Sequence, residues 1–270
     1  MSTDARESCR AIIRELVPAE LWAQNERFCG ELKQVMQGHG LLRDPLIAAL
    51  GSGALPPDAL KRVHLEFRYS FAQTFTDALL RAMYLSVRVE PRLGALGKVA
   101  ARFLLQFNVL DELGFLPTAG GYGGSPKRSH YAKFHETLRQ LDISEAEASA
   151  YVPTDAAVAC RRMIEGAYDD LVATLVILSV EETIFESFAA PWATNMRERT
   201  EVDVEKGYHS IHVEHDGGSL DDHHAEDLWY VLRMVLTPDD YARAKADAVT
   251  CLDTVHWFVR SLAGADRPAS

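Results

Sequence analysis

Residues 60–84 read LKRVHLEFRYSFAQTFTDALLRAMY, and their large apolar side chains recur at spacings of three and four. The recurring positions are Val63, Phe67, Phe71, Phe75, Leu79 and Met83. On an α-helix these positions form one stripe, because residues three or four apart lie on the same face. The stretch therefore predicts one long, half-buried amphipathic helix.

The same periodicity runs through residues 93–110, 156–188 and 228–262, and few segments show the alternation expected of strands. Glycine and proline turn signals separate the periodic stretches, at residues 51–57, 120–126, 153 and 217–218. None of these turns is long enough to be a flexible linker between domains. The sequence predicts an all-α bundle in a single domain spanning residues 1–270, with residues 120–126 as a loop inserted between two helices.

Composition narrows the class of protein. A chain of 270 residues that is 47% hydrophobic can bury a substantial core. Its net charge of -11 argues against nucleic-acid binding, which needs clustered Lys and Arg. Four scattered cysteines form no CxxC pair, and no apolar run reaches about 18 residues, which argues against disulfides, a signal peptide or a membrane span. We expect a cytoplasmic protein.

Two neighbouring segments concentrate imidazole and carboxylate groups. Residues 208–216 read YHSIHVEHD and residues 221–228 read DDHHAEDL, so together they hold five of the chain's 10 histidines. His212 and Asp216 are four residues apart and would share one face of a helix. Nitrogen and oxygen donors in this density favour a transition-metal site over a chance cluster on a solvated helix.

Acidic residues that interrupt apolar helices are the second sign of a metal site. Glu181 lies in the segment LVILSVEETIF, residues 175–185, where its neighbours three and four residues away are apolar, so it should point inward. Glu182 lies on a more polar face of the same helix, so it is the second candidate for an inward-pointing carboxylate. A buried carboxylate needs a compensating cation, which would be a metal ion or, alternatively, a core arginine. Glu112 ends one apolar helix and His130 opens the next.

Taken together, these features resemble the haem-oxygenase-like diiron oxidases and oxygenases, whose fold is a bundle of about seven core helices. The resemblance spans most of the chain and rests on four places: Gly53-Ala54-Leu55, the helix end from Asn108 to Gly114, the single Glu181, and a late helix with His, Asp, His and Ala. It implies a cofactor of two iron ions that react as Fe(II) with O2. The implied metal ligands are Glu112, His130, Glu181, His212, Asp216 and His224.

The chain departs from this family pattern in its first ligand pair. Glu112 and His130 are eighteen residues apart (130 minus 112), whereas the family places the pair closer. The glycine-rich residues 120–126 would then be an insertion that folds outward.

The late helix departs from the pattern too. Ser219 stands where the uninterrupted pattern would place a histidine, so the part before His224 contains extra chain. Either Asp216 or Asp221 is then the carboxylate ligand, and we favour Asp216 for its spacing to His212. The alternate ligands are Asp221, His223 and Glu182.

The resemblance implies an O2-dependent oxidase or oxygenase acting on a small carboxylate-bearing substrate, with a free amino acid favoured and a fatty acid as the alternative. An external electron donor would fit this chemistry, and exposed apolar stripes would fit a homodimer. Two other functions remain open: a metal-independent relative, thiaminase-like or quinone-cofactor-synthase-like, and a non-catalytic metal-binding bundle. Candidate pocket residues are Glu66 and Tyr69, and candidates for a carboxylate clamp are Arg68, Arg81, Arg162 and Arg233.

Overall fold

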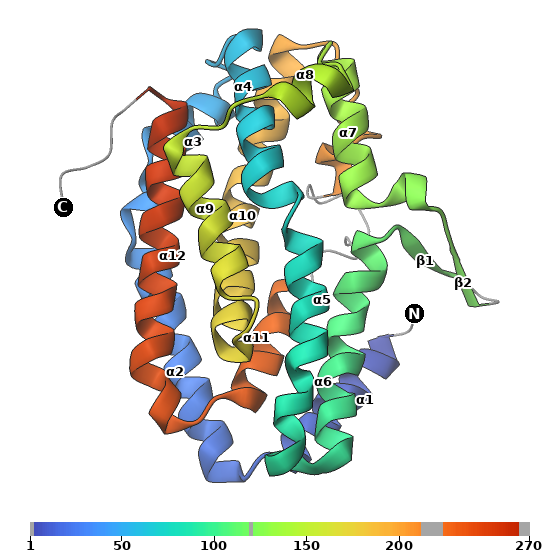
Figure 1. The fold of residues 1–270 in the computed structure, drawn as a ribbon, viewed down its shortest axis with the longest axis vertical. Helices are drawn as coiled ribbons and strands as arrows, with labels where there is room; N and C mark the ends of the chain where they lie inside the picture. The colour runs from blue at the N-terminus through green and yellow to red at the C-terminus, as the bar shows by residue number, and fades with distance from the viewer. Residues whose placement is uncertain (1–2, 119–120, 212–223, 265–270) are drawn as a thin grey trace.

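The computed structural model describes residues 3–118, 121–211 and 224–264, which form a bundle of helices with one short hairpin (Figure 1). The α-helices are α1 (Thr3–Leu16), α2 (Ala19–Gly38), α3 (Pro45–Gly51), α4 (Pro57–Phe67), α5 (Phe75–Leu85), α6 (Glu90–Glu112), α7 (His130–Gln140), α8 (Glu145–Ala150), α9 (Asp155–Gly166), α10 (Leu171–Arg199), α11 (His224–Val235) and α12 (Tyr241–Leu262). The 3-10 helices are η1 (Gly40–Arg43), η3 (Ser86–Val89), η4 (Pro126–Arg128), η5 (His209–Ile211) and η7 (Pro238–Asp240). The all-α fold class is confirmed.

Helix α10 is the axis of the bundle. It is 29 residues long, and its first half is buried on nearly every side. It packs against α3, α5, α11 and α12, as Figure 1 shows from one side, with α9 and α5 in front of it. A helix with apolar side chains on every side is stable only where all of its faces are buried. The other helices therefore surround α10.

The long helix expected over residues 60–84 is instead two helices joined by a π-helical turn, η2 (Arg68–Ala72). Hydroxyl groups explain the interruption. Ser70 donates to the carbonyl of Glu66 at 2.8 Å, and Thr74 donates to that of Ser70 at 3.0 Å. Such side-chain bonds compete with the backbone ladder, and the extra residue of the π-turn rotates the apolar stripe. The expectation of one helix was wrong at this point.

The predicted loop insertion is a β-hairpin that projects from the bundle between α6 and α7 (Figure 1). Its strands are β1 (Phe115–Thr118) and β2 (Gly121–Gly124), paired antiparallel. Gly124 has φ of 124°, and a Cβ there would lie 2.3 Å from the carbonyl oxygen of Gly114. Only glycine fits at this position, where the two strands of the hairpin come together next to the end of α6.

The helical stretch Pro57–Glu112 contains a window of 18 residues that is long and apolar enough, by length and composition alone, to cross a membrane. Half of its most apolar window is buried inside the bundle. Among the described residues no second run passes this test. Burial inside the bundle accounts for that half, while other large apolar side chains of this stretch, such as Tyr84 and Leu96, are exposed.

A buried ion pair fastens α1 to α11. Asp227 is fully buried, and its two carboxylate oxygens accept hydrogen bonds from Arg6 and Arg10, each at 2.7 Å. Both guanidinium groups are largely shielded from water as well, with side-chain exposures of 13% and 14%. The pair holds α11, and with it His224, against the N-terminal helix.

Replacing Asp227 by alanine should therefore leave two poorly hydrated guanidinium groups without a counter-charge. We expect the free energy of unfolding to fall by about 3–5 kcal/mol, measured by urea denaturation. The control is Glu165→Ala, which breaks the more exposed pair with Arg161 and should cost below about 1 kcal/mol. Equal decreases in the free energy of unfolding in the two variants would show that the buried ion pair stabilises the fold no more than the exposed one.

Candidate metal centre

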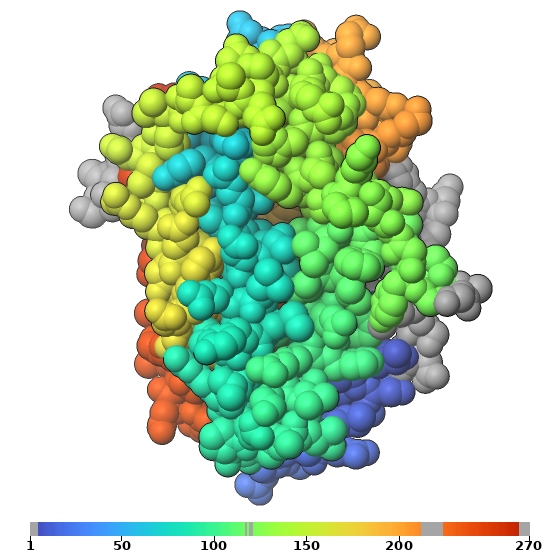
Figure 2. Space-filling view, turned by 45° about the vertical axis from the view of Figure 1, so that its right-hand side comes forward, coloured from blue at the N-terminus to red at the C-terminus, as the bar shows by residue number. Residues whose placement is uncertain are grey.

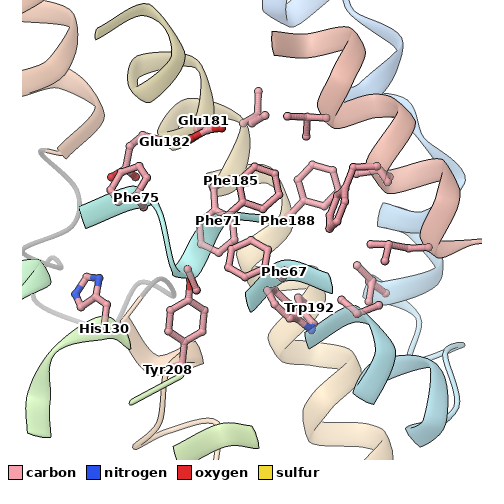
Figure 3. A pocket seen from close by; sticks show the side chains of 18 of the residues that line it. Phe67, Phe71, Phe75, His130, Glu181, Glu182, Phe185, Phe188, Trp192 and Tyr208 are labelled. Atoms are coloured by element: carbon pink, nitrogen blue, oxygen red, sulfur yellow. The ribbon is translucent and has the colours of Figure 1, made fainter. Parts of the chain in front are cut away.

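An apolar cavity of about 120 Å³ lies beside α10, and acidic and imidazole side chains gather at one end of it. Figure 3 shows Glu181 and Glu182 side by side on α10, with His130 of α7 facing them across the space. Glu112, at the end of α6, also lines this polar end. Aromatic rings make up much of the remaining wall: Phe67, Phe71, Phe75, Phe185, Phe188 and Trp192.

The interrupted helix described above shapes this wall. Phe67 ends α4, Phe71 lies in the π-helical turn and Phe75 begins α5, yet all three line the cavity. Figure 2 shows a hollow in the surface between α5 and α7. Phe75 of α5 and Tyr131 of α7 both line the cavity. A π-turn at this place fits the general observation that such turns occur at functional sites.

Carboxylates and imidazoles alternate along the polar end. Nδ1 of His130 lies 3.0 Å from Oε1 of Glu112, and its Nε2 lies 3.2 Å from Oδ2 of Asp111. The same Asp111 oxygen is 3.5 Å from Nε2 of His224, whose Nδ1 is 3.6 Å from Oε1 of Glu182. Two histidines from different helices are thus joined through one aspartate and flanked by two glutamates.

Glu181 stands apart from this chain of contacts. Its side chain is buried, and neither carboxylate oxygen receives a hydrogen bond from any described residue. Burial raises the pKa of Glu181 well above its ordinary value, and the neighbouring Glu182 carboxylate raises it further. A carboxyl group held this way is neutral in the metal-free protein, and only a cation placed beside it would make the anion stable.

The pKa of His130 is shifted in the opposite sense. Burial alone would lower it, but the adjacent carboxylates of Glu112 and Asp111 outweigh burial and raise the pKa to about 10. At neutral pH the metal-free protein therefore holds an imidazolium between two carboxylates. A metal ion that binds His130 must displace a proton, which makes metal binding stronger as pH rises.

The structure brings four of the six predicted ligands to one place: Glu112, His130, Glu181 and His224. The alternate ligand Glu182 is there too. The other predicted positions, His212, Asp216, Asp221 and His223, lie outside the described residues, although η5 ends at Ile211 and α11 begins at His224. Within the described ranges alone, no three His, Cys, Asp or Glu side chains converge closely enough to hold a metal ion.

Asp111 is the residue of this cluster that sequence reasoning missed. It lies beside Glu112 in the helix end from Asn108 to Gly114, but nothing in its apolar spacing distinguishes it from a surface acid. The feature that could have pointed to Asp111 is its spacing from Asn108: the two residues are three positions apart and lie on the same face of the helix. Asn108 is fully buried and donates to the backbone carbonyl of His224 at 3.1 Å, so this face of α6 meets the start of α11.

Two other candidates do not belong to the cavity. Glu66 is fully buried, and its carboxylate accepts bonds from the Tyr151 hydroxyl at 2.6 Å and the Thr154 hydroxyl at 3.0 Å. These bonds tie α4 to the α8–α9 connection, which is a structural role. Tyr69 lies under the guanidinium of Arg161 at 4.9 Å and is not part of the cavity wall.

The arginines considered for a carboxylate clamp are engaged elsewhere or exposed. Arg68 donates to the carbonyl of Ala148 at 3.0 Å, and Arg233 pairs with Glu226 at 2.6 Å. Arg81 lies over the ring of Tyr168, and Arg162 is exposed. Among the described residues, neither arginine nor lysine lines the cavity.

Comparison with solved structures identifies the fold. Two crystal structures of a CADD-like protein of unknown function from Nostoc punctiforme match over 90% and 91% of this chain and 95% and 100% of theirs, with TM-scores of 0.63 and 0.65 and identities of 14% and 16%. The chain has a haem-oxygenase-like fold. A TenA homologue from P. horikoshii matches with a TM-score of 0.53 and 14% identity, over 91% of this chain and 99% of that one. No protein-family model and no curated protein sequence matches.

The raised pKa of Glu181 predicts how the metal-free protein responds to pH. Folded protein keeps a proton on Glu181 that the unfolded chain loses above about pH 4.3, so this group's contribution to the free energy of unfolding falls as pH rises. Glu181→Gln, which cannot ionise, should lose less stability over the same range. Urea denaturation in chelator between mildly acidic and neutral pH measures both slopes, and the exposed Glu165→Gln should retain the native slope.

Parallel slopes for the native protein and Glu181→Gln would contradict the buried, unpaired state of this carboxyl group.

Proposed function

We propose that this protein is a non-haem diiron oxidase that uses O2 to oxidise a small substrate with an apolar chain. The observation that carries the proposal is Glu181, a buried carboxyl group without a hydrogen-bond partner among the described residues, at the junction of an apolar cavity and a carboxylate–imidazole chain. Such a group costs stability unless a cation accompanies it. The donors that surround it are the kinds that iron prefers.

The donor types gathered at the polar end, carboxylate and imidazole, are those that a pair of iron ions would need. Glu112, His130, Glu181 and His224 would hold them, with Glu182 as a further carboxylate from α10. His212 and Asp216, or the alternates Asp221 and His223, would complete the set from the segment between η5 and α11. Asp111 would accept a hydrogen bond from each ring nitrogen that faces it and so fix the orientation of both imidazoles.

Two ferrous ions bound here would reduce O2 and supply the oxidising power to remove hydrogen from a C–H bond. The side chains of the cavity would position the substrate and exclude water from the site. The rings of Phe67, Phe71 and Phe185 exclude water from the space next to Glu181. Loss of the proton on His130 would leave a neutral imidazole nitrogen that can bind a metal ion, and the metal ion would replace the proton's positive charge beside Glu112.

The wall of the cavity favours an aliphatic chain over a free amino acid. Beyond the acidic end its lining is almost entirely hydrocarbon, and among the described residues no cation is positioned to bind an α-carboxylate. A zwitterionic head group would be poorly solvated there. A fatty acid or similar chain matches the polarity of the wall, and the metal ions would supply the positive charge that its carboxylate needs.

A metal-independent hydrolase is less well supported. A thiol nucleophile would have to line the cavity, and none of the four cysteines does. Each is buried, and burial raises the pKa of Cys9 to about 11 and of Cys29 to about 12. Thiols in these surroundings are inert packing groups. A metal store without turnover uses the same ligands and is separated from an oxidase only by its reaction with O2.

Replacing Glu181 by glutamine should therefore abolish iron-dependent O2 consumption, by about 100-fold or more, because the amide cannot carry the negative charge that compensates the metal. An oxygen electrode with Fe(II) and a panel of fatty acids measures the rate. The matched control is Glu186→Gln, on the opposite face of α10 in a separate cleft with Lys33 and Glu226. Full activity in Glu181→Gln would contradict the proposed site.

The cavity wall should set the preferred chain length. Phe188 lies seven residues beyond Glu181 on α10, about 10 Å along the helix, and lines the cavity. Phe188→Ala should shift the kcat/KM ratio toward longer chains by roughly tenfold, since it opens the wall where the chain would end. Phe103→Ala, at an exposed ring outside the cavity, should leave the ratio unchanged. An unchanged ratio in Phe188→Ala would place the substrate elsewhere.

A further inference from the structure

The side chain of Trp192 places a polar atom in the wall of the cavity, at the end remote from the acidic residues. Trp192 is buried and lines the cavity, and its Nε1–H donates a hydrogen bond to no described residue. Figure 3 shows the indole well away from Glu181 and Glu182. Buried indole N–H groups usually have an acceptor, because an unmade hydrogen bond costs the desolvation of the donor. In the wall of a cavity, a bound molecule can supply that acceptor.

Trp192 lies on the same face of α10 as the proposed metal ligand Glu181. The residues Glu181, Phe185, Phe188 and Trp192 follow one another at spacings of four, three and four, and all four line the cavity. Trp192 is eleven residues beyond Glu181 (192 minus 181), which is about 16 Å along the helix. Helical side chains lean toward the N-terminus of their helix, which brings the indole back toward Phe188. A chain that starts at Glu181 and follows this face therefore passes both phenylalanines and ends beside the indole.

Neighbouring rings hold the indole in place. The ring centroids of His64, Phe67 and His209 lie 4.5, 5.1 and 5.0 Å from that of Trp192. Nδ1 of His64 lies 2.7 Å from the carbonyl oxygen of Leu60, and its Nε2 lies 3.2 Å from Nε2 of His209. Both ring nitrogens of His64 are therefore engaged, and neither serves as an acceptor for the indole.

The surroundings of the indole favour a neutral acceptor on the bound molecule. His64 is fully buried, and burial lowers its pKa to about 4, so its imidazole is uncharged at neutral pH. Among the described residues, neither lysine nor arginine lines the cavity, so a carboxylate beside the indole would be buried without either cation. A carbonyl oxygen accepts without donating, and an indole N–H donates without accepting. A carbonyl group is therefore the matching partner.

We propose that Trp192 is a specificity-determining residue whose Nε1–H donates a hydrogen bond to a carbonyl oxygen near the far end of the substrate chain. The inference rests on the proposed function, because it takes the other end of the chain to lie at Glu181. It narrows the substrate from a plain aliphatic chain to one with a keto, ester or amide carbonyl remote from the reacting carbon. An unsubstituted chain would leave the N–H buried and unpaired.

Anaerobic binding of two fatty acids of equal length tests the proposal. One acid is unsubstituted, the other carries a keto group next to its terminal methyl group, and a series of lengths lets the carbonyl reach the indole. Calorimetry of the native protein in the presence of Fe(II) should show about tenfold tighter binding of the keto acid at the best length. Equal or weaker binding of the keto acid at every length would overturn the proposal, and this comparison needs neither a variant nor turnover.

Trp192→Phe keeps an aromatic ring but removes the N–H, so it should lower the affinity ratio of the two acids by about tenfold. Trp22→Phe is the matched control and should keep the native ratio. The indole of Trp22 is also buried, with no hydrogen bond from its Nε1 to a described residue, but it packs against Tyr230 and Arg14 outside the cavity. A native affinity ratio in Trp192→Phe would contradict the assigned role.

Oxygen consumption separates this inference from the proposed function. Tighter binding of the keto acid without any consumption of O2 would count against the oxidase while supporting the role of Trp192. Consumption of O2 with equal kcat/KM for both acids, together with equal affinities, would support the oxidase and overturn the role of Trp192.

Discussion

A carboxylate in the middle of the most buried helix constrains the rest of this molecule. Glu181 lies in the buried half of α10, among apolar side chains and without a hydrogen bond from any described residue. A fold can tolerate such a group only as a neutral acid or beside a cation. Its position opposite His130 and next to Glu182 makes the second state chemically reasonable, because those groups are themselves metal donors.

The surrounding helices can be understood as the means of holding that arrangement. Helix α6 ends with Asp111 and Glu112, and α7 and α11 begin with His130 and His224. These candidate metal donors therefore lie at helix ends, where the chain direction at the end of the helix orients the side chain. The two acids of α10, in contrast, lie in the middle of their helix. Buried pairs away from the site, such as Asp227 with the arginines of α1, keep these helix ends in register.

Much of this was predictable from residue spacing. Apolar periodicity gave the all-α class, and the apolar neighbours of Glu181 correctly indicated an inward carboxylate. Glu112 and His130 were placed together by family resemblance although they are eighteen residues apart, and the hairpin formed by β1 and β2 explains how. Periodicity could not reveal the π-helical turn at Arg68–Ala72, because hydroxyl-to-carbonyl bonds within one helix leave the apolar spacing unchanged.

Tertiary contacts account for the other differences. Glu66 and Asp111 are both acids near apolar helix faces, yet Glu66 is satisfied by Tyr151 and Thr154 while Asp111 joins two histidines. Only the packing of α4 against the α8–α9 connection, and of α6 against α11, separates these roles. The ligand choice between Asp216 and Asp221 falls outside the described residues and stays a prediction.

Anaerobic titration of the metal-free protein with Fe(II), followed by calorimetry at two pH values, tests the central claim most directly. The account predicts two ions bound per chain, with proton release and tighter binding at the higher pH, because Glu181 and His130 must both give up protons to bind metal. Absence of Fe(II) binding, or binding that Glu181→Gln leaves unchanged, would contradict it.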